Sequence, residues 1–515
     1  MATITGFLPG LCIVACLLAA GCSEVGISEG PHNNVPEAIE VQAQRLSADL
    51  EQQGYEVNRG YFKLLTTEDA DYSYRTMGSC YGNNPAAPYV VFAVPPWPEE
   101  FVDPATKLAL GLTYEGYDTL FRLDPREAIV IFGQLPPDAS YFGMQTYLFS
   151  REGTFDTGSA QYIFFATYYP AFLSFFFATV PDNPARIQVF NSLGNSNNNA
   201  VIVNQSGAAF DQERFFIITP DQFMNDAIRQ SLAGISVADE NIFTEPIPPT
   251  VLTGLDEHAD DFAALIRYAE PLDQGTDGTP SALWRQDLPL VVLRVRDTRT
   301  ERTPVPYEPL VLETRTATDE SWLTDDLNNL VAEICTKWGL TSGPDCVSDF
   351  LSMQTWPVLM VGPIGTEIGM NCLGDTQDTS YHGTPNLSLD NGEIYAVVST
   401  LGTETDNASY VGLSVNESLK MKGIANISSK TLTGTAAEYG PTVNNTDKFY
   451  VYYFARDCSD LQIITSGHCF TVTEEMIPPG DYLKLAQRNY LRPGTQRGPD
   501  SSLILTPKLI KLKRP

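Results

Sequence analysis

Two segments of the chain share one pattern, and this similarity restricts the fold more than any other feature. The first begins at Glu127 with EAIVIFGQLPPDASYFGMQTYLFS, and the second begins at Glu393 with EIYAVVSTLGTETDNASYVGLSVN. Each reads as an apolar strand, a polar turn and a return strand with the motif Ala-Ser-Tyr-x-Gly, at 139–143 and 408–412. The repetition predicts a duplicated β-sheet module, and chance similarity of two strand–turn–strand segments is the alternative.

The length and composition of the chain agree with two such modules. A chain of 515 residues is longer than one ordinary hydrophobic core supports. Hydrophobic residues make up 43% of it and charged residues 18%, which is typical of a globular protein. A polar, arginine-rich stretch at 296–306 predicts the boundary between the modules. We therefore expect an N-terminal β-rich module at 37–300 and a C-terminal one, with disulfides, at 301–515.

The fold class that follows is α+β and β-rich, with two duplicated β-sheet modules and a few packed helices in each. Apolar residues recur at helical spacing in three segments outside the strands. These segments predict helices at 36–53, 219–234 and 319–338. The second of them has the clearest start, with Thr219 as N-cap and Pro220 in the first helical position.

An uncharged aromatic insertion, at 157–181, follows the first copy of the repeat. It holds nine Phe and Tyr side chains and no charged residue. From the repeated tyrosine to the next aromatic strand, the first copy spans 141–215, whereas the second spans only 410–450. The aromatic segment lies within this excess, and insertions at the rim of a scaffold often carry function.

The aromatic insertion has three interpretations. It has the length of a transmembrane helix, but Pro170 lies near its centre and β-rich sequence flanks it. It could instead be a core segment packed against a sheet, because Phe side chains bury large apolar areas. The third interpretation is a lid or wall of a pocket for an apolar or aromatic ligand. The candidate ligand-binding residues are Tyr162, Phe165, Tyr168, Tyr169, Phe172 and Phe176.

Residues 1–22 have the features of an export signal. Their apolar run, at 11–20, is too short to span a bilayer. The pentapeptide LAAGC at 18–22 resembles the lipobox of bacterial lipoproteins, in which the cysteine is lipidated and becomes the mature N-terminus. This resemblance implies a lipid on Cys22, a polar tether at 23–36, and attachment to a membrane in the periplasm or at the cell surface. An ordinary secretory signal, which would give a secreted protein, is the alternative.

The cysteines agree with export. Three of the nine lie in the signal segment, and six follow it. An even number in an exported chain predicts disulfide bonds. None of the six has the Cys-x-x-Cys or Cys/His spacing of a zinc site, so no metal is expected. The expected pairs are the two that are close in sequence and the remaining one by elimination: Cys335 with Cys346, Cys458 with Cys469, and Cys80 with Cys372.

The charge balance excludes several classes of partner. The chain has 63 acidic residues against 32 Lys and Arg, a formal net charge of −31. A surface this negative repels nucleic acid, so we exclude polyanion binding as the main function. No phosphate-binding loop, dinucleotide fingerprint, zinc-protease or calcium-loop pattern is present, so neither a nucleotide nor a cofactor is expected. The partners that remain are the membrane, through the N-terminal lipid, and an apolar ligand.

No catalytic motif identifies an activity, so the catalytic residues stay unknown from the sequence. The function expected first is binding of an apolar or aromatic ligand, or of a partner, by an exported protein. The alternative is a secreted hydrolase that uses a histidine with nearby acids. The candidate histidines are His258 in the acidic cluster Asp256, Glu257, Asp260 and Asp261; His382 near Asp375 and Asp378; and His468 beside Cys469.

Overall fold

The computed structural model describes residues 31, 33–85, 88–299, 302–340, 347–356 and 358–514. The predicted signal segment, Cys22 and most of the predicted tether lie outside these residues. In the described part, the long strands form four sheets, two from the chain before residue 298 and two from the chain after 346. The predicted α+β, β-rich class is confirmed.

The N-terminal module contains the first two sheets. The first has the strand order β1-β12-β4-β9-β10, and the second has β2-β3-β11-β5-β7-β6, with β8 beside β5. All neighbours are antiparallel except β9 and β10, which are parallel. The bounds are β1 Tyr55–Arg59, β2 Tyr61–Leu64, β3 Val90–Ala93, β4 Glu127–Gln134, β5 Ala139–Glu152, β6 Thr179–Val180, β7 Asn183–Ser192, β8 Asn197–Asn198, β9 Glu213–Thr219, β10 Ile242–Pro246, β11 Asp261–Pro271 and β12 Leu290–Asp297.

The C-terminal module contains the other two sheets. The third sheet has the order β13-β22-β16-β19-β20, and the fourth has β14-β15-β21-β17-β18. Again all neighbours are antiparallel except one pair, β19 and β20. The bounds are β13 Val347–Asp349, β14 Leu351–Ser352, β15 Thr379–Gly383, β16 Glu393–Thr400, β17 Tyr410–Glu417, β18 Lys422–Ser428, β19 Phe449–Ala455, β20 Cys469–Thr471, β21 Leu483–Tyr490 and β22 Lys508–Lys513.

The two modules have the same topology. When the short β6 and β8 are set aside, the remaining strands up to β12 correspond in chain order, one to one, to β13 through β22. The corresponding strands also pair in the same order and direction, including the single parallel pair. The repeated sequence segments form β4–β5 in the first module and β16–β17 in the second. This match supports the predicted duplication, because chance similarity of one strand–turn–strand segment would not extend to ten strands.

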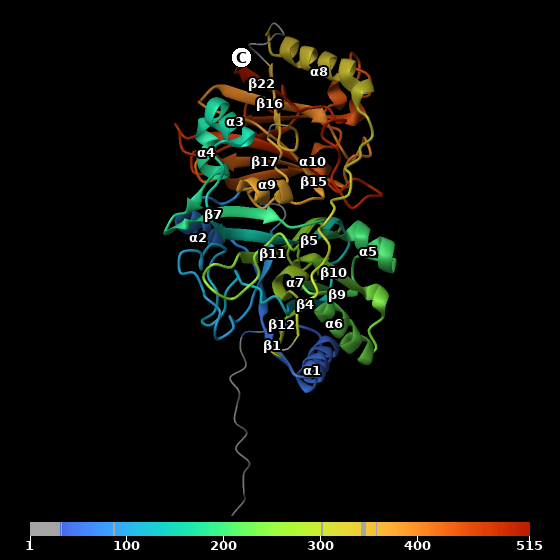
Figure 1. The fold of residues 1–515 in the computed structure, drawn as a ribbon. Helices are drawn as coiled ribbons and strands as arrows, with labels where there is room; N and C mark the ends of the chain where they lie inside the picture. The colour runs from blue at the N-terminus through green and yellow to red at the C-terminus, as the bar shows by residue number, and fades with distance from the viewer. Residues whose placement is uncertain are drawn as a thin grey trace, which may run out of the picture.

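Helices cover the outer ends of a layered stack. In the N-terminal module, α1 (Glu37–Gln52) and α6 (Gln222–Gly234) pack on the outer face of the first sheet, and in the C-terminal module α8 (Thr324–Lys337) packs on the third. Figure 1 shows α1 and α8 at opposite ends of the molecule. The second and fourth sheets therefore face the junction of the modules. The other helices are α2 Thr67–Met77, α3 Ala160–Tyr168, α4 Pro170–Phe176, α5 Asn199–Ser206, α7 Pro280–Asp287, α9 Gly362–Ile368 and α10 Ser429–Leu432.

The aromatic insertion forms two short helices, α3 and α4. Tyr169 lies between them in a non-helical conformation, because Pro170 has no backbone N–H for a continuous helix. In the second module, residues 418–421 alone connect the corresponding strands. Figure 1 shows α3 and α4 beside the C-terminal module, and their buried side chains belong to the same apolar cluster as residues of β5, β7 and β11. Within the described ranges, no helix is long and apolar enough to cross a membrane.

The start of α6 differs from the prediction. Thr219 stays in β9, where its hydroxyl donates to the Glu127 carbonyl at 2.7 Å. The helix begins at Gln222, and Asp221 is its N-cap, with a carboxylate that accepts from the Phe223 N–H at 3.2 Å. Thr219, which the local sequence pattern assigned to the helix cap, is thus part of the sheet instead.

The repeated Tyr-x-Gly motif has a packing role in both modules. Side chains two residues apart on a strand lie on the same face, so each tyrosine lies over its glycine. A Cβ atom on Gly143 would lie 2.5 Å from the Tyr141 hydroxyl oxygen, and one on Gly412 would lie 3.2 Å from the Tyr410 hydroxyl oxygen. Glycine therefore leaves the space that the tyrosine side chain occupies.

We expect Gly143→Ala to lower the free energy of unfolding by about 1–3 kcal/mol, because the added methyl group overpacks the buried Tyr141. Chemical denaturation followed by circular dichroism measures this change. Gly234→Ala is the matched control, because nothing lies within 4 Å of its added Cβ. Equal midpoints for the two variants would contradict the packing role.

Candidate functional site

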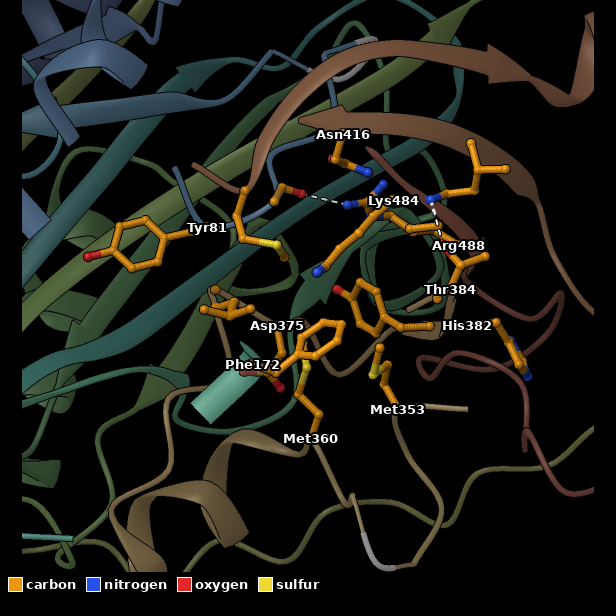
Figure 2. A pocket seen from close by; sticks show the side chains of 18 of the residues that line it. Tyr81, Phe172, Met353, Met360, Asp375, His382, Thr384, Asn416, Lys484 and Arg488 are labelled. Carbon is orange, nitrogen blue, oxygen red and sulfur yellow. Dashed lines mark hydrogen bonds between the residues drawn. The ribbon is translucent and has the colours of Figure 1, made fainter. Parts of the chain in front are cut away.

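A cavity lies at the junction of the two modules. It encloses about 770 Å³ of atom-free space, part of which is open to solvent. Its lining comes from the second and fourth sheets, from α4 and from loops of both modules, so neither module forms it alone. Figure 2 shows Phe172, Met353 and Met360 at one side, and Lys484 and Asn416 at the other. One end of the cavity is therefore apolar and the other is polar.

The six aromatic candidates divide between wall, core and surface. Phe172 and Phe176 line the cavity. Phe165 is buried behind them and stacks on Phe176, with ring centroids 4.5 Å apart. Tyr162 and Tyr169 are half-buried in the same apolar cluster, whereas Tyr168 is 68% exposed. The insertion is thus partly core and partly cavity wall, and only two of the six predicted residues reach the cavity.

Two loops with the sequence Cys-x-Gly lie beside the cavity. Loop 79–84 lies between α2 and β3, and loop 371–376 lies between α9 and β15, which are matching places in the duplicated topology. In each loop the residue after the cysteine has a positive φ, 57° at Tyr81 and 55° at Leu373, and the glycine after it has one too. Glycine adopts this conformation without strain, so the Cys-x-Gly pattern suits the loop.

Each Cys-x-Gly loop pairs with the backbone of the other module. The N–H of Gly82 donates to the Met421 carbonyl at 2.7 Å, and the N–H of Gly374 donates to the Phe190 carbonyl at 2.8 Å. The first contact runs from the N-terminal to the C-terminal module, and the second runs in the opposite direction. The modules therefore exchange these loops reciprocally.

The loop exchange corrects one cysteine prediction. Cys80 and Cys372 are buried free thiols, so the predicted bond between them is wrong. They occupy equivalent positions of the two copies, and each lies against the other module. The predicted Cys458–Cys469 bond is confirmed. The predicted Cys335–Cys346 pair involves a residue outside the described ranges.

Each module also contributes an arginine to the cavity. Arg267 on β11 and Arg488 on β21 each lie in register opposite the glycine of the Tyr-x-Gly motif. Arg267 Nη2 donates to the Gly374 carbonyl at 2.8 Å, and Arg488 Nη2 donates to the Gly82 carbonyl at 2.5 Å. Each arginine thus holds the loop that arrives from the other module.

Tyrosines repeat around these loops in the same way. Nine residues after each loop cysteine comes a tyrosine, Tyr89 or Tyr381. Their hydroxyl oxygens accept from the Asn84 and Thr376 N–H groups, at 3.0 Å in both modules. Both tyrosines line the cavity beside the arginines. The loop, the arginine and the tyrosine therefore form one constellation that occurs twice.

The motif tyrosines meet at the centre of the junction. The ring of Tyr490 lies 4.8 Å from that of Tyr141 and 5.1 Å from that of Tyr410, measured between centroids. The Tyr141 hydroxyl donates to Asp378 at 3.0 Å, so this carboxylate also ties the second module to the first. Tyr141 and Tyr410, the tyrosines of the repeated motif, thus form part of the contact between the two modules.

Lys484 is the ionisable group whose surroundings are most unusual. Its ammonium group is 3.6 Å from the ring centroid of Phe172, and it donates to Ser418 Oγ at 3.0 Å and to Asn386 Oδ1. Burial lowers the pKa of Lys484 to about 7, although Glu417 opposes this shift. A lysine that lines a cavity and whose pKa is lowered to about 7 is a candidate functional group.

Asp375 supplies a carboxylate to the cavity lining, and neighbouring groups already hold it. It accepts hydrogen bonds from Ser192 N–H and Oγ, both at 2.9 Å, from Gly362 N–H at 3.0 Å and from Gln377 Nε2 at 2.9 Å. Burial raises the pKa of Asp375, and these hydrogen bonds act in the opposite direction. These hydrogen bonds join the two modules and hold the carboxylate in place.

The three candidate histidines lie in three different surroundings. His258 is exposed and lies 2.7 Å from Glu152, which raises the pKa of its imidazole. His382 is buried, its pKa is lowered to about 4 by that burial, and its ring points away from the other labelled side chains (Figure 2). His468 lies beside the Cys469 disulfide. Among the described residues, no imidazole of the three is hydrogen-bonded to a hydroxyl group.

The acidic clusters are held by other side chains. Asp260 pairs with Arg151 at 2.6 Å, and Asp261 pairs with Arg186 at 3.2 Å and Arg122 at 3.3 Å. Asp378 lies apart from His382 and accepts from the Tyr141 hydroxyl. Within the part of the chain that the structure describes, no group of three or more His, Cys, Asp or Glu is placed to hold a metal ion.

Sequence reasoning missed the basic residues of the cavity. Arg267, Arg488 and Lys484 lie inside segments that read as ordinary apolar strands. One available signal was a single arginine at the same place in both β11 and β21. Another was the Cys-x-Gly motif followed nine residues later by tyrosine, which occurs at Cys80 and Cys372. Both signals extend the repeat beyond the two strands that carry the Tyr-x-Gly motif.

Comparison with known proteins adds a distant structural similarity. No family model matches the chain, and no curated protein matches it. An uncharacterized protein from Burkholderia cenocepacia is similar with 10% identity, coverage of 93% of this chain and 91% of that chain, and a TM-score of 0.37. The VPA0106 protein from Vibrio parahaemolyticus is similar with 10% identity, coverage of 87% and 97%, and a TM-score of 0.34. These values support no argument about function.

Peptide mapping without reduction tests the cysteine assignment. After denaturation in the presence of an alkylating reagent, we expect alkylated Cys80 and Cys372 and a linked peptide pair containing Cys458 and Cys469. Alkylation of the two thiols should require denaturation, because both are buried and burial raises their pKa. A linked peptide pair containing Cys80 and Cys372 would contradict the loop exchange.

Proposed function

We propose that the protein binds a small apolar or aromatic ligand in the cavity between its modules, as an exported protein held at a membrane by a lipid on Cys22. The observation that carries this proposal is the cavity wall formed by Phe172 and Phe176. Their insertion has no counterpart in the second module, so it is an addition to the duplicated scaffold. Its buried end lies at the cavity.

The composition of the cavity supports a binding role. Phe172, Phe176, Met353 and Met360 supply an apolar surface, and methionine side chains adapt to ligands of irregular shape. A few polar groups at the opposite end would fix the orientation of a ligand. A junction between two modules is also a common place for a small-molecule site.

Ala486→Trp tests whether the cavity binds a ligand. Ala486 lines the cavity from β21 and is only half-buried, so an indole at this position would fill the cavity without replacing a core side chain. With N-phenylnaphthylamine, a neutral apolar probe, we expect the variant to bind at least about tenfold more weakly than the native protein. Probe fluorescence measures the affinity.

The control for the cavity-filling variant is Ala437→Trp, at an exposed position remote from the cavity lining. It should bind the probe as the native protein does. Equal probe binding by the native protein and Ala486→Trp, with both folded by circular dichroism, would overturn the proposed site.

Cys22→Ala tests the lipid anchor. Because the variant lacks the thiol that would carry the lipid, we expect it in the soluble fraction of cells, whereas the native protein sediments with membranes. Immunoblots of the two fractions measure this distribution. If the variant remained with membranes, the anchor would be elsewhere, and the exposed Tyr168 on the aromatic insertion would be the next residue to test.

A further inference from the structure

We infer that the ligand of the cavity carries a carboxylate on its apolar or aromatic body, and that Lys484 holds this carboxylate. The inference rests on the proposed binding function and specifies the class of ligand. It follows from the charges that line the cavity, from the contacts those charges already make, and from the separation of polar and apolar side chains along its wall.

Three buried cations line the cavity without an ion pair. Arg267, Lys484 and Arg488 are 3%, 5% and 6% exposed. In the described ranges, none of them has a carboxylate oxygen within the 4.0 Å that defines a salt bridge. Their hydrogen-bond partners are hydroxyl, amide and carbonyl oxygens, so no carboxylate of the described residues is in direct contact with them. Glu417 acts on Lys484, and Asp375 on Arg267, only at longer range.

The fully buried arginines of the N-terminal module differ in this respect. Arg294 pairs with a glutamate at 2.6 Å and with a second at 2.7 Å, and Arg122 and Arg186 share an aspartate. Because acidic residues outnumber basic ones about twofold, the chain has carboxylates to spare. Burying a charge without a partner is costly. Since Asp375 is held by Ser192, Gly362 and Gln377 and forms no ion pair with the three cations, an anionic ligand would supply the ion pair that the described residues do not.

Lys484 is the cation best placed to take this anion. An ammonium group has three donors, and the hydrogen bonds to Ser418 and Asn386 use two of them. The two arginines instead hold the exchanged loops through their carbonyls. Asn416 lies in register beside Lys484 and lines the same end of the cavity, and its Nδ2 donates to Ser414 Oγ at 3.1 Å. This end is therefore built for a polar head group.

The position of the apolar body follows from the same geometry. The ring of Phe172 lies next to the ammonium group of Lys484, and Phe176 and Met360 continue the apolar wall. Figure 2 shows this arrangement, with the methionines opposite the polar end. A ligand whose carboxylate contacts Lys484 would lay its apolar part along these side chains.

Binding of a carboxylate should depend on pH. Because burial lowers the pKa of Lys484 to about 7, its positive charge is present below this pH and is lost as the pH rises. Glu417 on β17 faces it and favours the charged form, while α4 presents no charged residue. Arg488, Arg267, Asp375, Tyr381 and His382 are other ionisable lining residues. We expect the affinity for a carboxylate to fall about tenfold between pH 6 and pH 8.

Competition between matched probes tests the inference. Decanoate and decanol have the same chain length and differ in charge, so each is used at pH 6 to displace N-phenylnaphthylamine from the full-length protein. We expect decanoate to bind about tenfold more tightly than decanol, because only the carboxylate forms a hydrogen bond in which donor and acceptor carry opposite charges. Lys484→Met should abolish this preference, and Lys484→Arg should keep most of it.

Lys448→Met removes the same charge from a residue that does not line the cavity and pairs with Asp447. It should keep the preference for decanoate. Near-ultraviolet circular dichroism of each variant confirms that it is folded. If decanol and decanoate bind equally, and Lys484→Met changes neither, the carboxylate inference is overturned while the binding function stands. If the native protein binds none of the three probes, both proposals fall.

Discussion

The reciprocal exchange of the two Cys-x-Gly loops is the interaction on which the rest of the structure depends. Each loop leaves its own module, pairs with the backbone of the other and accepts a hydrogen bond from an arginine there, Arg488 for loop 79–84 and Arg267 for loop 371–376. The cavity walls come from both modules. Its shape therefore depends on this exchange, since separated modules would each retain only part of the lining.

The elements that join the two modules at the cavity occur in both copies, whereas the side chains that give the cavity its apolar wall and its lysine occur in one copy only. The Tyr-x-Gly motif, the arginine and the loop occur in both modules and join them symmetrically. By contrast, Phe172 and Phe176 belong to an insertion found only in the first module, and Lys484 corresponds in register to Ala263, an apolar residue, in the first. The apolar wall and the basic end thus both arose where the copies differ.

Much of the fold could be predicted from local sequence patterns. The amphipathic spacing in α1 and α8 and the apolar runs of the repeated strands are local patterns, which the sequence displays directly. The start of α6 was predicted wrongly because Thr219 is held in β9 by a partner strand distant in sequence. The Cys80–Cys372 pairing was wrong because proximity in space was assumed from the lack of other partners.

The sequence by itself indicated a β-rich chain with two similar segments, and showed that an aromatic insertion follows the first of them. Both conclusions rest on repetition and composition, which do not require knowledge of long-range contacts. Only the tertiary structure decided that the aromatic insertion divides between core, wall and surface, and that basic residues from distant strands meet beside Phe172. The physical reason is that strand register and loop exchange bring these groups together, and neither is encoded by local spacing.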